Sequence, residues 1–159
     1  MRTPGPAGPA ASRIVLDTNV CLDLLLFEDP RVNLLAEALR SGNVVAVVDA
    51  DCRAEWLRVL GYPALRLQDP RRSALIDAFD ALMQPVSTDA NRRDGKPPPR
   101  CVDPDDQKFL RLAHATGARW LLSRDQHLLV LAARCRRDGL FEILTPQDWA
   151  ARFAQAASV

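Results

Sequence analysis

The chain has 159 residues, 48% of them hydrophobic, and its 21 basic and 20 acidic residues leave a formal net charge of +1. This length suits one domain with its own core, and the near-neutral charge means that nucleic-acid binding would need local basic patches. No apolar run approaches the ~18 residues of a membrane helix, and the four cysteines form no CxxC pair, so we expect a cytoplasmic protein with free thiols and without structural zinc.

The first half of the domain is predicted to contain two buried strands separated by helices. Residues 1–12 are rich in Pro, Gly and Ala and lack the apolar core of a signal peptide, so we expect a disordered leader there, followed by one domain over residues 13–155. RIVLD, at 13–17, is an apolar run that ends in an acid and is typical of a buried strand. VVAVV, at 44–48, indicates a second strand that is buried on both faces. Helical spacing of apolar residues predicts helices over residues 18–27, 31–40, 50–62 and 70–83.

The second half begins with the longest loop, the polar and Pro-rich residues 87–102. A helix is predicted from Asp103 to Gly117, because Asp at the cap, Pro at the first helical position and acids in the first turn are typical of a helix start. ARWLLS (118–123) and LFEIL (140–144) indicate two further strands. Helices are predicted over residues 125–135 and 145–157, the second of them capped by Thr145.

Strands therefore alternate with helices along the whole predicted domain. This alternation indicates an α/β fold with three layers, in which a central parallel sheet of about four to five strands is flanked by helices on both faces.

Four acids are expected to converge at one edge of this sheet, because ligands of open parallel sheets lie outside the carboxyl ends of the strands. Asp17 ends the first strand and Asp125 follows the third, whereas Asp106 lies in the first turn of the helix that leads into the third strand. Glu55 lies about one and a half turns into the helix after the second strand. Convergent carboxylates repel one another unless a cation neutralises them, and Mg²⁺ or Mn²⁺ suits oxygen ligands. Phosphodiester hydrolysis is the chemistry that uses such a site.

Each acid also has a purely structural interpretation. Asp103 and its acidic neighbours fit the roles of helix cap and first-turn acids, and we expect Asp103 to be mainly the cap, with Asp106 turned inward. Asp125 is equally suited to cap the helix that follows it, and a Glu on an amphipathic helix, such as Glu55, usually belongs to a solvated face. The joint placement of the acids, rather than any one of them, favours the metal site.

In three segments the chain resembles the PIN domain, and in particular the VapC-like toxins of bacterial toxin–antitoxin systems: LDTNV, AEWLRVL and DPDDQKFLRLAHATGARWLLSRDQHLL. The resemblance implies a PIN-like fold and a Mg²⁺- or Mn²⁺-dependent endoribonuclease that hydrolyses RNA. It also implies a small antitoxin protein as partner and a homodimer. It assigns catalytic roles to Asp17, Glu55, Asp106 and Asp125, with Asp17, Asp106 and Asp125 as metal ligands. It adds supporting roles for Asn19 and Ser123, and Asp103 is close enough in sequence to assist or replace Asp106.

Basic residues crowd the long loop, where they either grip an RNA backbone or form a solvated surface. They are Arg92, Arg93, Lys96 and Arg100. The only two histidines, His114 and His127, have no ligand-spaced partner in the sequence, so histidine-based catalysis is not expected.

Three other classes of protein fit the sequence less well. A haloacid-dehalogenase-like phosphatase needs a second Asp two residues after the first, where this chain has Asn19. A receiver-like signalling domain needs an acidic pair near the first strand and a later Lys, neither of which is evident. A non-catalytic PIN-like scaffold that binds RNA or protein predicts the loss of at least one acid, whereas all four are present.

Overall fold

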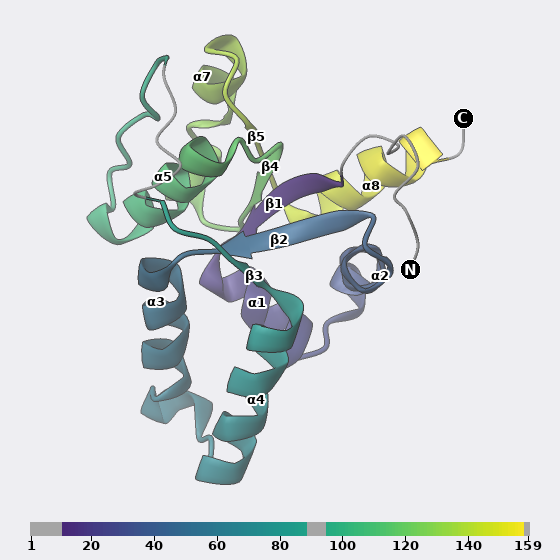
Figure 1. Cartoon of the computed structure of the whole chain (residues 1–159), viewed down its shortest axis with the longest axis vertical. Helices are drawn as coiled ribbons and strands as arrows, with labels where there is room; N and C mark the ends of the chain where they lie inside the picture. Colours follow the sequence, from purple (N-terminus) through teal and green to yellow (C-terminus); the bar gives the residue numbers. More distant parts are fainter. Residues whose placement is uncertain (1–10, 89–94, 158–159) are drawn as a thin grey trace, which may run out of the picture.

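Five short parallel strands form the central sheet, in the order β3-β2-β1-β4-β5 (Figure 1). The structure is a computed structural model that describes residues 11–88 and 95–157, so most of the predicted leader lies outside the described residues. The strands are β1 (Ser12–Leu16), β2 (Val44–Val48), β3 (Gln84–Pro85), β4 (Trp120–Leu122) and β5 (Glu142–Leu144). The predicted α/β architecture is confirmed, and β1 begins one residue before the predicted domain boundary.

Helices connect the strands and cover both faces of the sheet. In chain order, with η for a 3₁₀ helix, they are α1 (Thr18–Leu25), η1 (Pro30–Val32), α2 (Asn33–Ser41), α3 (Ala50–Leu60), η2 (Pro63–Leu65), α4 (Asp69–Leu82), η3 (Pro104–Asp106), α5 (Gln107–Thr116), α6 (Gln126–Leu129), α7 (Ala132–Arg137) and α8 (Pro146–Ala157). The crossover from β1 to β2 and the crossover from β3 to β4 run in opposite directions along the sheet. Right-handed crossovers therefore place α2 and α5 on opposite faces. Within the described residues, no helix has both the length and the apolar character required to span a bilayer.

The core forms because the strands present almost only apolar side chains, so both faces of the sheet can be buried. Ile14, Val15, Leu121 and Leu122 are fully buried in the central strands β1 and β4. Below the sheet in Figure 1, α3 and α4 extend side by side, and their contact includes the stacked rings of Trp56 and Phe79 at 5.0 Å between centroids. All four cysteines are buried and unpaired, as predicted.

Two local predictions differ from the structure. The helix predicted over 125–135 is divided into α6 and α7, because Leu131 N–H donates to Leu128 C=O, three residues back, and this tighter turn interrupts the α-helical pattern. The two-residue strand β3 was not predicted, since Gln84-Pro85 is short and Pro cannot donate to a sheet. Its place at the sheet edge makes the missing donor harmless.

The order of the strands reverses at β1: β2 and β3 follow it on one side of the sheet, and β4 and β5 on the other. The backbone pairing continues one residue beyond both central strands, because Asp17 N–H donates to Leu122 C=O at 3.1 Å and Ser123 N–H donates to Leu144 C=O at 3.0 Å. Asp17 and Ser123 therefore lie side by side at the carboxyl edge, at the switch point where ligands of such sheets bind.

Candidate active site

Asp17 connects the end of β1 to the start of α1. One carboxylate oxygen, Oδ1, accepts from Val20 N–H at 2.9 Å, so the side chain is the N-cap of α1. The other oxygen accepts from the hydroxyl of Ser123. The residue is only 4% exposed, and burial raises the pKa of its carboxyl from 3.8 to about 6. The fold thus maintains a desolvated acid at the switch point.

Ser123 joins Asp17 to the segment that carries Asp125. It is fully buried directly after β4, and its Oγ also accepts from the backbone N–H of Asp125 at 2.9 Å. Asp125 caps α6 by accepting from His127 N–H at 2.8 Å, so both of its predicted roles, helix cap and member of the acid group, are compatible. The intervening Arg124 forms an ion pair with the buried Asp23 of α1, at 2.9 Å.

Asp106 comes to the same edge from η3. As predicted, Asp103 is the cap: its Oδ1 accepts from Asp105 N–H at 2.9 Å, and Asp106 is turned inward and half-buried. Burial and the neighbouring carboxylates of Asp125, Asp103 and Asp17 raise the pKa of Asp106 to about 7. Its Oδ2 atom is buried and has no hydrogen-bond partner among the described residues. A buried carboxylate oxygen without a donor indicates that a further positive group belongs here.

The three acids Asp17, Asp106 and Asp125 lie close enough for the charges of Asp17 and Asp125 to raise the pKa of Asp106. None of them forms an ion pair with Lys or Arg within the described parts of the chain. Because like charges at close range disfavour ionisation, the group is stable as carboxylates only with a neutralising partner. Oxygen donors from three separate segments are the ligand type that Mg²⁺ and Mn²⁺ take.

Glu55 has a different environment from the other three acids. Its carboxylate accepts from the hydroxyl of Thr18 and from Lys108 Nζ, the latter at 2.7 Å, and Arg58 lies 4.0 Å away. The side chains of Glu55 and Lys108 are only 16% and 13% exposed. Glu55 therefore reaches the residue that follows Asp17, but α5 already supplies it with a counter-charge.

A family model described as the PIN domain matches residues 13–127. The chain belongs to the PIN-domain family. Its structure is similar to the crystal structure of VapBC2 from Rickettsia felis bound to a DNA fragment from their promoter, with a TM-score of 0.52 and 12% sequence identity. That match covers 82% of this chain and 96% of the other, which shows a common fold. No curated protein matches the sequence significantly.

The other residues predicted to support the site or to bind RNA differ in exposure and in their partners. Asn19 is exposed in the first turn of α1. Arg100 is exposed after a run of three prolines, whereas Lys96 forms an ion pair with Asp138 at 3.3 Å. Arg92 and Arg93 lie outside the described residues.

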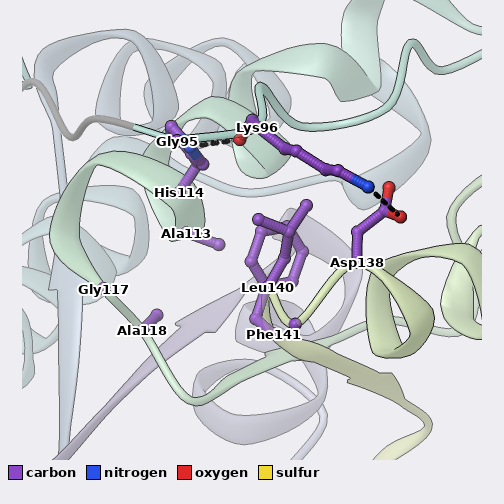
Figure 2. Close-up of a pocket in the computed structure, with 10 residues that line it drawn as sticks. Gly95, Lys96, Ala113, His114, Gly117, Ala118, Asp138, Leu140 and Phe141 are labelled. Atoms are coloured by element: carbon purple, nitrogen blue, oxygen red, sulfur yellow. Dashed lines mark hydrogen bonds and ion pairs between the residues drawn. The ribbon is translucent and has the colours of Figure 1, made fainter.

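Lys96 lines a pocket of about 300 Å³ together with His114 and with Leu140 and Phe141, the two residues before β5 (Figure 2). His114 Nε2 is 2.9 Å from the backbone oxygen of Lys96. The pocket includes Ala118, before β4, and Phe141, before β5, so it lies at the amino edge of the sheet. The acids of the PIN domain lie at the opposite edge, and this pocket does not belong to their site.

Two residues near the acids were missed by the sequence interpretation. Lys108 lies two positions after Asp106, and a basic residue so close to a proposed ligand was a readable signal. His127 was set aside because it lacks a ligand-spaced partner, yet its Nδ1 lies 3.9 Å from Asp103 Oδ2 and 3.6 Å from Asp125 Oδ1. Local spacing could not indicate the contact between Asp103 and His127, which lie 24 positions apart in the sequence.

Proposed function

We propose that this PIN domain is a metal-dependent endoribonuclease that hydrolyses phosphodiester bonds of RNA. One observation carries the proposal: the buried Oδ2 of Asp106 has no donor, in a group of carboxylates that has no Lys or Arg partner among the described residues. A nuclease function also agrees with the family, whose members are typically nucleases.

In this proposal Asp17, Asp106 and Asp125 hold Mg²⁺ or Mn²⁺. The bound cation would lower the pKa of a water molecule and stabilise charge on the phosphate. Ser123 orients Asp17 by donating to its Oδ2, while the cap bond from Val20 N–H fixes Oδ1. The rigid β1–α1 and β4–α6 junctions therefore position two of the ligands before any substrate arrives.

We further propose that the protein is the toxin of a VapBC-type pair, acts in the cytoplasm and forms a homodimer. The similar solved structure, by its title, is a VapBC2 assembly on promoter DNA, and this supports a small antitoxin protein as partner.

Cleavage of RNA tests the function directly. The purified protein is incubated with a mixed single-stranded RNA pool in Mg²⁺, in Mn²⁺ and in EDTA, and the products are resolved on a denaturing gel. Cleavage in either metal and none in EDTA is the expected result. RNA that binds and remains intact in both metals would instead favour the non-catalytic scaffold.

A basic groove next to Asp106 is the proposed path of the RNA backbone. The groove has a volume of about 510 Å³. Its lining residues are Pro97, Pro98, Arg100, Cys101, Pro104, Gln107 and Arg111. Gln107 fixes the Pro-rich wall, because its side chain accepts from Cys101 N–H at 2.6 Å and donates to Pro99 C=O at 3.1 Å. Neither Arg100 nor Arg111 has an ion-pair partner among the described residues, so both are available to phosphate.

The double substitution Arg100→Ala/Arg111→Ala is expected to weaken RNA binding without unfolding the protein. Because each phosphate contact releases a counterion, the slope of log K against log salt should decrease by about 1.4, roughly 0.7 for each arginine on single-stranded RNA. Fluorescence anisotropy at several salt concentrations measures this slope. Arg136→Ala/Arg137→Ala, which removes two exposed arginines of α7, is the control and should leave the slope unchanged. Equal slopes for both double variants would exclude the groove as the RNA path.

A further inference from the structure

Two carboxylates and one imidazole gather beside the proposed catalytic centre. Asp103 and Asp106 belong to the η3 turn, and His127 belongs to α6. One ligand atom of each lies within 4.8 Å of the other two. The imidazole lies on the solvent side, since the His127 side chain is 52% exposed, whereas the Asp106 Oδ2 atom is buried without a partner. The cluster is therefore open to solvent at His127, and at Asp106 it holds a buried oxygen that no donor among the described residues contacts.

The backbone holds these three side chains in place. His127 N–H donates to Asp125, and its C=O accepts from Cys101 Sγ at 3.4 Å, so the α6 start is tied to the Pro-rich wall of the basic groove. The Oδ1 atom of Asp103 is used by its cap bond, which leaves Oδ2 directed toward the imidazole Nδ1 at 3.9 Å. This separation is too long for a hydrogen bond.

The size of the cluster suits one metal ion. Opposite ligands of an octahedral cation of Mg²⁺ size are separated by about 4.2 Å, twice the metal–oxygen distance. At most one pair of three ligands can be opposite, and adjacent ligands lie about 3.0 Å apart, so the Asp103 and His127 ligand atoms would approach by about 0.9 Å from their present 3.9 Å. Two carboxylates supply negative charge, and the neutral imidazole supplies a nitrogen donor, which Mg²⁺ disfavours and first-row transition metals accept.

We infer that Asp103, Asp106 and His127 bind one divalent transition-metal cation, and that this site prefers Mn²⁺ to Mg²⁺. The inference deepens the proposed function and rests on it, because Asp106 is shared with the proposed catalytic centre and because the inference names the metal that the protein takes. Asp103 acts here as a ligand through Oδ2 in addition to its role as the cap of η3. His127, which lies outside the proposed set of Asp17, Asp106 and Asp125, becomes the residue that selects the metal.

Manganese spectroscopy tests the inference without reference to RNA cleavage. The tag-free protein contains only the two histidines, His114 and His127, so any nitrogen signal from imidazole is assigned unambiguously. The metal-free protein is titrated with MnCl₂, bound Mn²⁺ is quantified by electron paramagnetic resonance, and ¹⁴N coupling is recorded by electron spin echo modulation. Binding of MgCl₂ is measured by calorimetry. The variants are His127→Ala and the control His114→Ala, whose ring lies at the amino edge of the sheet.

The wild-type protein and His114→Ala are expected to show ¹⁴N modulation on Mn²⁺, and His127→Ala is expected to lose it. Mn²⁺ binding should weaken about 10-fold or more in His127→Ala, in the range found when a metal site loses one supporting group, while Mg²⁺ binding changes little. His127→Asp, which restores an oxygen donor, should bind both metals and lose the preference for Mn²⁺.

Wild-type protein that binds Mn²⁺ without ¹⁴N modulation, and with the affinity of His127→Ala, would overturn the inference. His127 would then be an imidazole that lies beside the acids without binding the metal. This result is distinguishable from failure of the proposed function, because RNA cleavage by the wild-type protein in either metal would stand unchanged. Conversely, histidine-coordinated Mn²⁺ in a protein that leaves RNA intact would retain the metal site and reject the nuclease.

Discussion

Asp17→Asn is expected to abolish RNA cleavage and, at the same time, to stabilise the metal-free protein. Loss of a supporting residue around a metal typically costs 10- to 100-fold, so the loss of a direct ligand should reduce kcat by at least about 100-fold. Gel assays of the purified variant in Mg²⁺ and Mn²⁺ measure this loss. Cleavage at the wild-type rate would show that the activity comes from a contaminant or from another site.

The expected gain in stability follows from the same burial. Asn is as good an N-cap as Asp, so the bond from Val20 N–H can be kept, while a desolvated charge is removed. The raised pKa of Asp17, about 6 against 3.8, means that its charged form is disfavoured in the folded protein. After allowance for the altered bond to Ser123, we expect a gain of roughly 1–2 kcal/mol in the free energy of unfolding at pH 8. Thermal unfolding in EDTA should show a rise of about 3–6 °C.

The pH dependence of this gain has a definite sign. A folded-state pKa above the unfolded value means that the native protein binds more protons, so its stability falls as pH rises from about 4 through the folded pKa values. The relevant values are about 6 for Asp17 and about 7 for Asp106. Metal-free wild-type protein should therefore unfold at a lower temperature at pH 8 than at pH 5.5. Asp17→Asn should show a smaller difference, and saturating Mn²⁺ should reverse it in the wild-type protein.

Asp49→Asn is the matched control for Asp17→Asn. Asp49 ends β2 as Asp17 ends β1, is buried at 8% exposure, and caps α3 by accepting from Cys52 N–H at 2.9 Å. It does not belong to the proposed metal centre, so its replacement should leave cleavage within about 2-fold of the wild type, since a conserved cap costs at most a few tenths of a kcal/mol. A similar loss of cleavage in both variants would mean that any buried strand-end acid is needed for folding, which would remove the special role of Asp17.

Much of the fold was predictable because its signals are local. The run VVAVV corresponds to β2 without displacement, and the cap at Asp103 is where the motif DPDD places it. The position of Asp17 was also predictable, since an acid directly after a buried parallel strand lies at the carboxyl edge of the sheet. Strand β3 was not predictable in this way, because only its contact with β2 makes Gln84-Pro85 a strand.

The candidate site was predictable in outline but not in its charge balance. The four acids were placed from strand ends and from the family resemblance, and three of them share the unneutralised edge. The cation that pairs with Glu55 and the imidazole beside Asp103 come from segments distant in sequence. The first contact depends on how α5 packs against α3, and the second on how the start of α6 lies against η3, which no local sequence pattern predicts.

The pairing of Glu55 with Lys108 allows the chemical and structural roles of Glu55 to be separated. Glu55→Gln removes the counter-charge of a Lys108 ammonium that is 13% exposed. Because breaking a buried ion pair leaves one charge uncompensated, the variant should lose roughly 2–3 kcal/mol of stability as well as cleavage. Chemical denaturation and gel assays measure the two effects. Glu37→Gln, on the exposed surface of α2, should change neither.

The double variant Glu55→Gln/Lys108→Met decides between the two roles. Removing both charges should return the free energy of unfolding to within about 1 kcal/mol of the wild type, since well-packed apolar replacements of buried pairs are often neutral. If Glu55 acts chemically at the centre, cleavage stays lost in this stable protein. Recovery of cleavage together with stability would show instead that Glu55 serves only to hold Lys108, and the catalytic set would then be reduced to the three acids that lack a Lys or Arg partner.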